Sequence, residues 1–584
     1  MSMQKSTVFL YNKSNVYGLG QDIHVLETSL QQLVGKIRIA DPLEPPTPCD
    51  LAVHFEVPYY GWMSWARRNV IIVNPEWWEA AWNPYLTHTD ALIFKCSADR
   101  DHFLEQLPKD SKKPDTYVLP WTTSLSVASF TKYPKSNKSS TGILWLLGAS
   151  KNKRAAAEKL LPLWKADWPK LYVSTTTPLT FETTQENIIV NIRDLDSATL
   201  RQLQAYYPGH MIFSASEALG MSALEGQAAG AFLLGNGLPT YLETFKGNPY
   251  VALTQAILDD LKAGKQDTFA SLEDELEECV EKFLKADLDE CRSSQTRLAA
   301  MRSADFTKKA YQCFQEILKK YSPLASVAAV PPQFKSAAEC PPISVITLLH
   351  NRRKFVDLAF HNLLITDYPK DKIEWVVIED SDIVEEQASD KIIKFGTQCA
   401  PMTVTYIPLD KKNVPIGAMR NRAVKKAQHD IILFMDDDDH YPASSFSRRV
   451  AWLLLHPWEP SAVVCTTIAC YDLVHGTSAV NTPPWSLPLS QRISEATFAF
   501  KKSWWDGQRF PKVNMAEGEG FLQGREADVL ELQPQQLIVA MSHVKNASSR
   551  RIPPTGKPSC FWGFPKEFLV FLHKLAGVDI EEIQ

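Results

Sequence analysis

Short apolar runs alternate with amphipathic segments along the first 320 residues of the chain. The apolar runs predict strands at 6–11, 51–55, 69–73 and 91–95, and again at 142–147, 171–174, 211–214 and 231–234. Apolar residues at helical spacing predict helices at 22–33, 154–163 and 305–321. Strands that alternate with helices are typical of a parallel sheet with helices on both faces. We therefore predict an α/β protein with two Rossmann-like domains in this region.

The same alternation continues after residue 342. Apolar runs predict strands at 343–348, 375–378 and 431–435, and helical spacing predicts helices at 356–364 and 418–427. The third of these strands runs directly into four consecutive aspartates, Asp436 to Asp439. Because ligands of open α/β sheets gather at the carboxyl ends of the strands, we expect a functional site at this end of the sheet.

Two stretches rich in turn formers and small residues interrupt the alternation, at 132–141 and 322–342. We predict domains at 1–135, 136–325 and 343–584, with a linker at 326–342. A length of 584 residues by itself suggests about four domains at roughly 150 residues each. The linkers reduce this number to three.

Composition restricts the classes of protein. Hydrophobic residues make up 45% and charged residues 22% of the chain, which excludes a disordered or fibrous protein. A net charge of −5 provides no general attraction for nucleic acid, so no nucleic-acid partner is expected. The ten cysteines form no CxxC pair, which argues against a zinc module and favours a reducing compartment. With no signal-peptide core and no apolar window of about 18 residues, the sequence predicts a cytoplasmic location and no transmembrane segment.

The aspartate run carries the clearest chemistry. Four like charges at the end of a buried strand repel one another unless water or a cation neutralises them. Mg²⁺ and Mn²⁺ bind carboxylates together with phosphate oxygens, so a metal site for a phosphorylated ligand is one interpretation. The alternative is a solvated acidic turn, or a cap for the helical segment that begins at Ser444.

An ordered set of motifs surrounds this run. Ser344-Val345-Ile346-Thr347 and Asn351-Arg352 follow one another at the first strand, and Glu379-Asp380-Ser381 ends the second. Gly417 and Arg420-Asn421 precede the third strand, and Asp436 to Asp439 follow it. In this order the motifs resemble the GT-A glycosyltransferases, in particular the large inverting family that includes chitin, cellulose and hyaluronan synthases. The resemblance covers about residues 343 to 550.

The resemblance implies roles for individual residues. Asp380 would contact the nucleotide base, with Arg420 and Asn421 also in the donor site. Asp436 and Asp438 match the DxD motif: Asp436 would face the ribose and take part in the metal site, and Asp438 would bind Mn²⁺ or Mg²⁺, with Asp439 as a supporting partner. His543 resembles a late histidine that completes the metal or diphosphate site in some relatives.

An inverting transfer also needs a general base on the acceptor hydroxyl, and a carboxylate is suited to that role. In the family's acidic motif the base lies six residues before an arginine. Counting back from Arg525 gives Glu519, with Glu517 as the competing choice. The alternative interpretation of this segment is a flexible acidic loop.

Two glutamates in the amino-terminal half are separated by seven residues, Glu217 and Glu225. Ser222 and Glu225 fit a capping box, which would explain Glu225 without a ligand. The stretch also resembles the E-x7-E signature of retaining GT-B glycosyltransferases. That resemblance implies that Glu225 binds the ribose and that Glu217 lies near the transferred sugar. Gly18 and Gly20, in a predicted turn after the first strand, would allow close backbone approach to the donor or acceptor.

One position departs from the GT-B pattern. The family places an arginine directly after the glycine that ends the first strand of its second domain, whereas this chain has Ala149 after Gly148. A diphosphate-binding lysine of the family corresponds to Lys153, with Lys151 and Arg154 as alternatives. The departure removes one of the two cations that the resemblance implies for the diphosphate.

Together these features predict a fusion of a GT-B half and a GT-A half, which transfers sugars from nucleotide-sugar donors to an oligosaccharide or glycoconjugate acceptor. The GT-A half would be metal-dependent and inverting, and the GT-B half retaining. The alternatives are a single active GT-A transferase with a degenerate GT-B module that binds the acceptor, or a metal-dependent phosphotransferase or nucleotide hydrolase.

Two apolar features of the sequence remain open at this point. The aromatic residues concentrated at 59–85 could form a sugar platform, or could fill a core or a contact between domains. The amphipathic segment 564–578 could touch a membrane or pack on its own domain.

Overall fold

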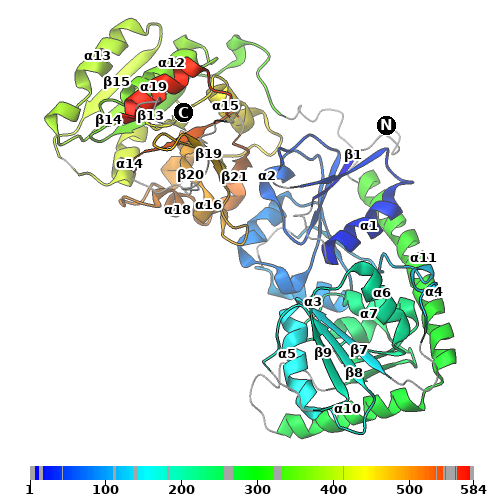
Figure 1. The fold of residues 1–584 in the computed structure, drawn as a ribbon. Coiled ribbons are helices and arrows are strands. Elements are labelled where there is room, and N and C mark those ends of the chain that lie inside the picture. Colours follow the sequence, from blue (N-terminus) through cyan, green and yellow to red (C-terminus); the bar gives the residue numbers. More distant parts are fainter. Residues whose placement is uncertain are drawn as a thin grey trace.

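Three α/β units lie in a row in the protein, with the amino-terminal unit in the middle (Figure 1). The computed structural model describes residues 7–11, 18–41, 44–109, 113–135, 142–180, 185–255, 267–320, 331–411, 413–534, 536–543, 546, 560 and 562–578. Each unit is built on a sheet of six or seven strands.

The first unit is a six-stranded parallel sheet in the order β2-β1-β3-β4-β5-β6. Its strands are β1 (Thr7–Tyr11), β2 (Lys36–Ala40), β3 (Leu51–Phe55), β4 (Asn69–Ile72), β5 (Ala91–Phe94) and β6 (Asp115–Val118). The helices are α1 (Gly18–Leu30), α2 (Tyr60–Met63), α3 (Ser97–Gln106) and α4 (Ala128–Thr131). Strands β2 and β6 were not predicted, because these edge strands mix polar and apolar residues and are only partly buried.

The second unit repeats this architecture, with parallel strands in the order β12-β11-β10-β7-β8-β9. The strands are β7 (Ile143–Gly148), β8 (Leu171–Thr175), β9 (Ile188–Ile192), β10 (Gly209–Met211), β11 (Phe232–Asn236) and β12 (Val251–Thr254). The helices are α5 (Lys151–Leu160), α6 (Ser197–Tyr206), α7 (Met221–Ala229), α8 (Pro239–Thr244), α10 (Asp267–Lys285) and α11 (Leu288–Lys320).

Helix α11 joins the two amino-terminal units. It runs along both of them in Figure 1, and its later residues Phe306, Phe314 and Ile317 lie in one hydrophobic core with α1 and β1 of the first unit. The same core includes Leu224 and Leu233 of the second unit. The two Rossmann-like units therefore share buried apolar surface in this structure.

The third unit is a mixed seven-stranded sheet in the order β15-β14-β13-β16-β20-β17-β21, with a second sheet β19-β18-β22 beside it. Its strands are β13 (Ile343–Leu349), β14 (Ile373–Glu379), β15 (Thr403–Pro408), β16 (Ile431–Phe434), β17 (Ala462–Cys465), β18 (Ile468–Asp472), β19 (Thr477–Asn481), β20 (Ser494–Lys501), β21 (Val529–Leu532) and β22 (Val539–Ser542). Its helices are α12 (Val356–Ile365), α13 (Ser389–Gln398), α14 (Ile416–Lys426), α15 (Ser445–Leu455), α16 (Leu489–Arg492), α17 (Lys502–Gly507), α18 (Glu517–Leu522) and α19 (Lys566–Ala576).

The predicted fold class is confirmed: two Rossmann-like domains precede a third α/β domain. Some local predictions were wrong. Gly18 and Gly20 lie in the first turn of α1 and not in a turn before it, because the helix starts four residues earlier than the predicted helix. The alternative interpretation of the acidic segment was a flexible loop. The segment begins instead with helix α18. Most of the stretch 132–141, and 322–330 of the second predicted linker, lie outside the described residues.

The aromatic residues at 59–85 join the first unit to the third. Tyr60 stacks on Tyr85 at 4.3 Å between ring centroids, and its hydroxyl donates to the carbonyl of Val529 at 2.7 Å. Trp82 Nε1 donates to the carbonyl of Trp485 at 2.8 Å. Tyr60, Trp82 and Tyr85 are all buried. The prediction that this segment makes an interdomain contact is confirmed.

Removing the Tyr60 hydroxyl is expected to weaken this contact. Tyr60→Phe keeps the stacked ring and leaves the buried carbonyl of Val529 without its donor, so the protein should lose about 1 kcal/mol of stability. Thermal unfolding of the variant measures the effect. The control is Tyr206→Phe at an exposed ring, for which we expect no measurable change. Equal unfolding temperatures for both variants would contradict the importance of this contact.

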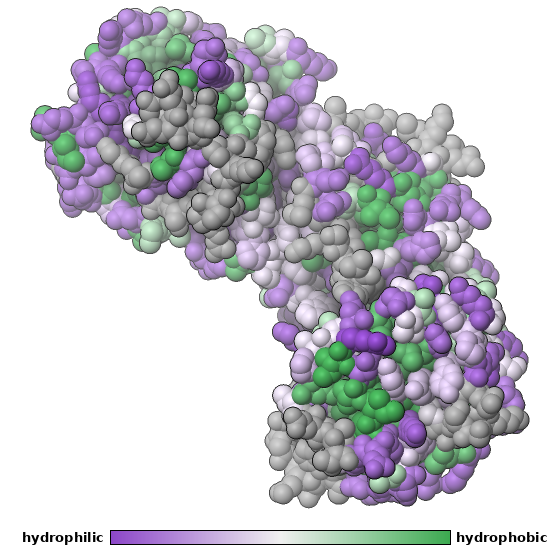
Figure 2. All heavy atoms as spheres, viewed as in Figure 1, coloured by the Kyte–Doolittle hydropathy of each residue, from purple (hydrophilic) through white to green (hydrophobic). Residues whose placement is uncertain are grey.

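Figure 2 shows a largely hydrophilic face over the carboxyl-terminal domain and a hydrophobic patch over the second unit. Helix α19 packs with Phe355, Leu358 and β18 of its own domain, as the second interpretation of segment 564–578 predicted.

All ten cysteines are free thiols. Within the described part of the chain, no helix combines the length and the apolar character needed to cross a membrane.

Candidate active site

The aspartate run lies at the carboxyl ends of three parallel strands. Strand β13 lies between β14 and β16 and is parallel to both, so all three strands end at the same edge of the sheet. The four aspartates follow β16 in a turn. Tyr441 fixes this turn, because its hydroxyl accepts from the backbone N–H of Asp436 at 3.0 Å and donates to the carbonyl of Ala496 at 2.9 Å. The sequence pattern thus places the carboxylates where a ligand is expected.

Asp438 is the centre of a group of polar side chains. Its Oδ2 lies 2.6 Å from Arg352 Nη1 and 3.1 Å from His543 Nε2, and it accepts from Asn546 Nδ2 at 3.3 Å. His543 is held from the other side by Phe355, whose ring stacks on the imidazole at 4.1 Å. We predicted both Asp438 and His543 as metal ligands from the sequence. They lie 105 residues apart along the chain and are in contact in the structure.

Asp437 and Asp439 have different surroundings. Asp437 is buried beside Arg352, 3.1 Å away, and burial raises the pKa of this carboxyl well above its usual value. Asp439 is fully buried, and its Oδ1 accepts from the backbone N–H of Met541 at 2.9 Å. Asn362 donates to the Asp439 carbonyl at 2.8 Å. Asp439 therefore fastens the acidic turn to strand β22.

A pocket of about 320 Å³ opens beside the turn. Asp380, at the end of β14, lies in it, and its two oxygens interact with His350 Nδ1 at 2.8 Å and with the N–H of Val414 at 3.0 Å. Asp436 and Arg420 line the same pocket. The structure thus brings the predicted base-binding, ribose-binding and donor-site residues together around one space.

Asn421 does not line this pocket with its neighbour Arg420. Its Nδ2 donates to the carbonyl of Phe510 at 2.7 Å, and its Oδ1 accepts from the N–H of Phe510 and from Trp505 Nε1. Asn421 therefore holds the segment 505–510 in place.

The two candidate bases differ in their surroundings. Glu517 is buried, and its Oε1 accepts from Arg420 Nε at 2.8 Å. Glu519, one half-turn further along α18, is partly exposed and accepts from Gln491 Nε2 at 2.8 Å. Glu517 is therefore held in a buried ion pair, whereas Glu519 keeps a more accessible carboxylate beside a neutral amide.

A third carboxylate, Glu495 of β20, lies against the start of α18. Its Oε1 accepts from the N–H of Gly518 at 3.3 Å. A Cβ at position 518 would lie only 2.7 Å from the Glu495 side chain, which explains the glycine. Burial, reinforced by the negative charge of Glu517 and opposed by Arg420, raises the pKa of Glu495 from 4.5 to about 7.

This shift predicts a pH-dependent stability. A carboxyl whose pKa is higher in the folded state stabilises the fold most below its unfolded pKa, and this contribution is lost as the pH rises from about 4.5 through about 7. Glu495→Gln keeps an oxygen for the N–H of Gly518 and cannot ionise. We expect the unfolding temperature of the variant, relative to the wild type, to increase between pH 5 and pH 8. A difference that does not change with pH would contradict this assignment.

The carboxylates of the turn fit a divalent cation. One carboxylate oxygen from each of Asp436, Asp438 and Asp439 lies within 4.8 Å of the others. The imidazole of His543 adds a nitrogen donor next to Asp438. Carboxylate oxygens together with imidazole suit Mn²⁺, and the carboxylates alone suit Mg²⁺.

The amino-terminal half places its two predicted glutamates differently. Glu217 follows β10 and lies 3.5 Å from Lys153 Nζ, with both side chains partly accessible. Glu225 in α7 is buried, and its oxygens accept from Gln21 Nε2 at 3.0 Å and from Gln204 Nε2 at 2.7 Å. Protein amides therefore occupy both oxygens of the residue that the resemblance assigned to the ribose.

The capping box is not formed. Helix α7 begins after Gly220, whose φ of 74° is left-handed, and no side chain caps it. Ser222 lies inside the helix and its Oγ accepts from Lys153 Nζ at 2.8 Å. A cap therefore does not explain Glu225.

Lys153 contacts both Glu217 and Ser222. It lies in the first turn of α5, just after Gly148 and Ala149, and Ser150 caps this helix by accepting from the N–H of Lys153 at 3.3 Å. Gly148 has a φ of 53° at the end of β7, a backbone conformation that favours glycine.

Three residues of the carboxyl-terminal site had no role in the sequence-based prediction: His350, Arg352 and Glu495. Arg352 belongs to the Asn351-Arg352 motif, and its position three residues after the end of β13 (Ile343–Leu349) could have suggested a partner for the aspartates. His350 and Glu495 carry no sequence signal, because they meet the site only when β13, β14 and β20 assemble.

One family model matches part of the carboxyl-terminal domain. Residues 344–493 match the family model described as Glycosyl transferase family 2. No curated protein sequence matches the chain.

Several solved structures resemble parts of the protein. Mannosyltransferase PcManGT from Pyrobaculum calidifontis, in complex with GDP-Man and Mn²⁺, is 16% identical over 40% of this chain and 63% of its own, with a TM-score of 0.28. S. aureus TarS 1–349, in complex with UDP-GlcNAc, is 18% identical over 35% of this chain and 59% of its own (TM-score 0.28). The pneumococcal O-GlcNAc transferase GtfA, in complex with UDP and GlcNAc, is 13% identical over 47% of this chain and 57% of its own (TM-score 0.34). The chain thus spans about three fifths of the length of each.

Proposed function

We propose that the carboxyl-terminal domain transfers a sugar from a nucleoside-diphosphate donor to an acceptor hydroxyl, with inversion and with a divalent metal. The match of residues 344–493 to the family model supports this proposal. The observation that carries the proposal is the convergence of Asp380, Asp436, Asp438 and His543 at one edge of the sheet, beside a pocket of about 320 Å³.

Each part of a nucleotide-sugar has a counterpart in this arrangement. Asp380 and His350, which line the pocket, would offer hydrogen-bonding groups to the base, and Asp436, on the same pocket, would face the ribose. Asp438 and His543, with Asp436, would hold Mn²⁺ or Mg²⁺. Such an ion, when bound, neutralises the charge that develops on the departing diphosphate. Arg352, which pairs with Asp438 and Asp437 in this structure, is a second cation within reach of the phosphates.

The chemical step follows from the carboxylates on α18. The acceptor oxygen attacks the anomeric carbon and forms the new glycosidic bond while the bond from that carbon to the diphosphate breaks. The bonding electrons leave with the nucleoside diphosphate, and the hydroxyl proton passes to Glu519. Glu517, engaged by Arg420, keeps α18 in place beside the donor pocket.

For the amino-terminal half, the contacts favour the degenerate module over a second, retaining transferase. The carboxylate of Glu225 is buried and accepts from Gln21 and Gln204. The position after Gly148 holds alanine where GT-B enzymes carry an arginine. A donor would have to displace Gln21 and would meet one cation fewer. We propose that this half serves the carboxyl-terminal transferase as a structural or acceptor-binding module.

A donor screen tests the proposal. The intact protein is incubated with Mn²⁺, a panel of nucleotide-sugars and candidate acceptors, while released nucleoside diphosphate and product mass are measured. We expect acceptor-dependent release that a chelator stops. Release that is equally fast without any acceptor, and yields only free sugar, would support the nucleotide hydrolase and contradict the transferase.

A further inference from the structure

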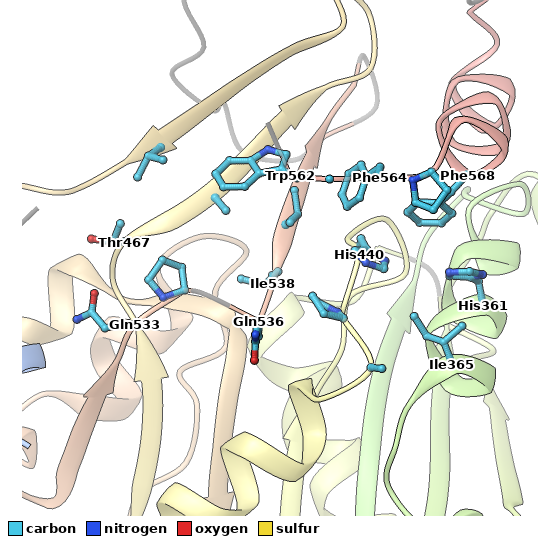
Figure 3. Close-up of a pocket in the computed structure, with 18 of the residues that line it drawn as sticks. His361, Ile365, His440, Thr467, Gln533, Gln536, Ile538, Trp562, Phe564 and Phe568 are labelled. Carbon is cyan, nitrogen blue, oxygen red and sulfur yellow. The ribbon is translucent and has the colours of Figure 1, made fainter. Parts of the chain in front are cut away.

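A second and larger cavity lies in the carboxyl-terminal domain. Its volume is about 910 Å³, in the range of small-molecule sites, and it shares no lining residue with the pocket of Asp380 and Asp436. It lies between α12, the small sheet β19-β18-β22 and the start of α19 (Figure 3). Trp62 of the amino-terminal domain also lines it, so it lies where two domains meet. We call it the aromatic cavity.

The walls of the aromatic cavity are mostly rings and aliphatic groups. Trp562, Phe564 and Phe568 line one side in Figure 3, and Gln533 and Gln536 lie across from them. The rings support one another, since Phe564 and Phe568 pack edge to face at 5.2 Å between centroids. Such a surface binds apolar chains and rings by burying them from water.

The described lining of the cavity carries no acidic side chain and no lysine or arginine. Its polar side chains are imidazoles, amides and hydroxyls, such as those of His361, Gln533 and Thr467. A carboxylate or an amine would lose its hydration here without gaining a carboxylate, ammonium or guanidinium partner from these residues.

The aromatic cavity is built on the same chain segments as the donor site. His440, whose ring lies 4.8 Å from that of Phe568, directly follows Asp439 in the acidic turn. The backbones of His440 and Val539 pair in both directions at 3.0 and 2.9 Å. Two residues after Val539, Met541 donates to Asp439. One turn and one strand thus contribute to the metal-binding carboxylates and to the wall of the cavity.

We propose that the aromatic cavity binds the uncharged, apolar part of the glycosyl acceptor, such as an alkyl or aromatic aglycone. This inference rests on the proposed transferase function for its acceptor role. Gln533, Gln536 and Thr467 provide hydrogen-bonding groups for the neutral polar atoms that join such an aglycone to its sugar. The acceptor is thereby expected to be amphipathic, and free sugars are expected to bind poorly.

Direct binding tests the cavity without relying on catalysis. The full chain, without donor or metal, is titrated with the neutral fluorescent probe N-phenyl-1-naphthylamine. Dodecyl β-D-glucoside, below its micelle-forming concentration, and methyl β-D-glucoside are then compared as competitors. We expect saturable binding of the probe, displacement by the dodecyl glucoside, and no displacement by the methyl glucoside at the same concentration.

Two variants locate the bound probe. Val480→Trp adds a bulky ring at the exposed edge of the cavity, and Ala469→Leu fills its buried wall. Each is expected to weaken probe binding about tenfold or more, which corresponds to about 1.4 kcal/mol. The control is Val474→Trp, the same substitution at an exposed valine that does not line the cavity. Unfolding temperatures show that each variant is folded.

Three results would overturn the proposal: no saturable probe binding, equal binding by the folded Val480→Trp, Ala469→Leu and Val474→Trp proteins, or equal displacement by both glucosides.

The transfer assay tests the acceptor role. The dodecyl glucoside should have a lower KM than the methyl glucoside, and Val480→Trp should remove this difference. Transfer in which the two glucosides have equal KM would refute the acceptor role and leave the transferase intact. Absence of any transfer, with probe binding retained, would refute the transferase function.

Discussion

Replacing Asp438 by asparagine is expected to reduce glycosyl transfer by about 10³-fold or more. The carboxylate of Asp438 is the point where Arg352, His543 and the carboxylates of Asp436 and Asp439 come together. An amide offers a weaker, uncharged oxygen, so the variant should bind the metal poorly. A metal contributes several kcal/mol of transition-state stabilisation, and each 1.4 kcal/mol is about tenfold in rate. Release of nucleoside diphosphate under saturating donor measures the loss.

Two comparisons make this result specific. Asp410→Asn changes the same group at an exposed position, and transfer should be unchanged. Glu217→Gln addresses the amino-terminal half. If that half is a module without its own transfer, Glu217→Gln should leave the product masses unchanged, whereas loss of one of two glycosidic products would restore the two-transferase interpretation. Full activity of Asp438→Asn with Mn²⁺ would refute the proposed metal site.

Substitution of the two glutamates of α18 is expected to have different effects: one on kcat and the other on stability. Glu519→Gln removes a partly exposed carboxylate whose described partner is the neutral Gln491. It should lower kcat by about 10²–10⁴-fold, the usual contribution of a general base, with little change in unfolding temperature. Glu517→Gln leaves the buried Arg420 without its carboxylate. Breaking a buried ion pair in this way costs about 3–5 kcal/mol of stability.

Kinetics and unfolding measured on both variants separate the two roles. The outcome that would reverse the assignment is a stable Glu517→Gln protein that has lost kcat, together with a Glu519→Gln protein that has kept it. The pH dependence of kcat in the wild type adds a further check, because Glu519→Gln should remove the limb that reports the base.

The acidic site could be predicted from sequence because its members belong to ordered local patterns. An apolar strand that ends in Asp436 to Asp439 requires the aspartates to lie at the carboxyl edge of a sheet, and Asp380 follows a neighbouring strand in the same way. Local patterns also gave a wrong prediction at Gly18 and Gly20. The preference of glycine for turns suggested a turn there, but both glycines lie in the first turn of helix α1.

What the sequence by itself determined was the fold class, the alternation of strands and helices over much of the chain, and the ordered motifs from which we predict the donor site. These follow from periodicity and from short motifs, which are local properties of the chain. Only the tertiary structure decided that Gln21 and Gln204 engage Glu225, that Arg420 engages Glu517, that Glu495 lies against α18, and that residues 59–85 join two domains. These partners lie up to several hundred residues apart, and side-chain pairing at such separations depends on how the sheets assemble and which groups they bury together.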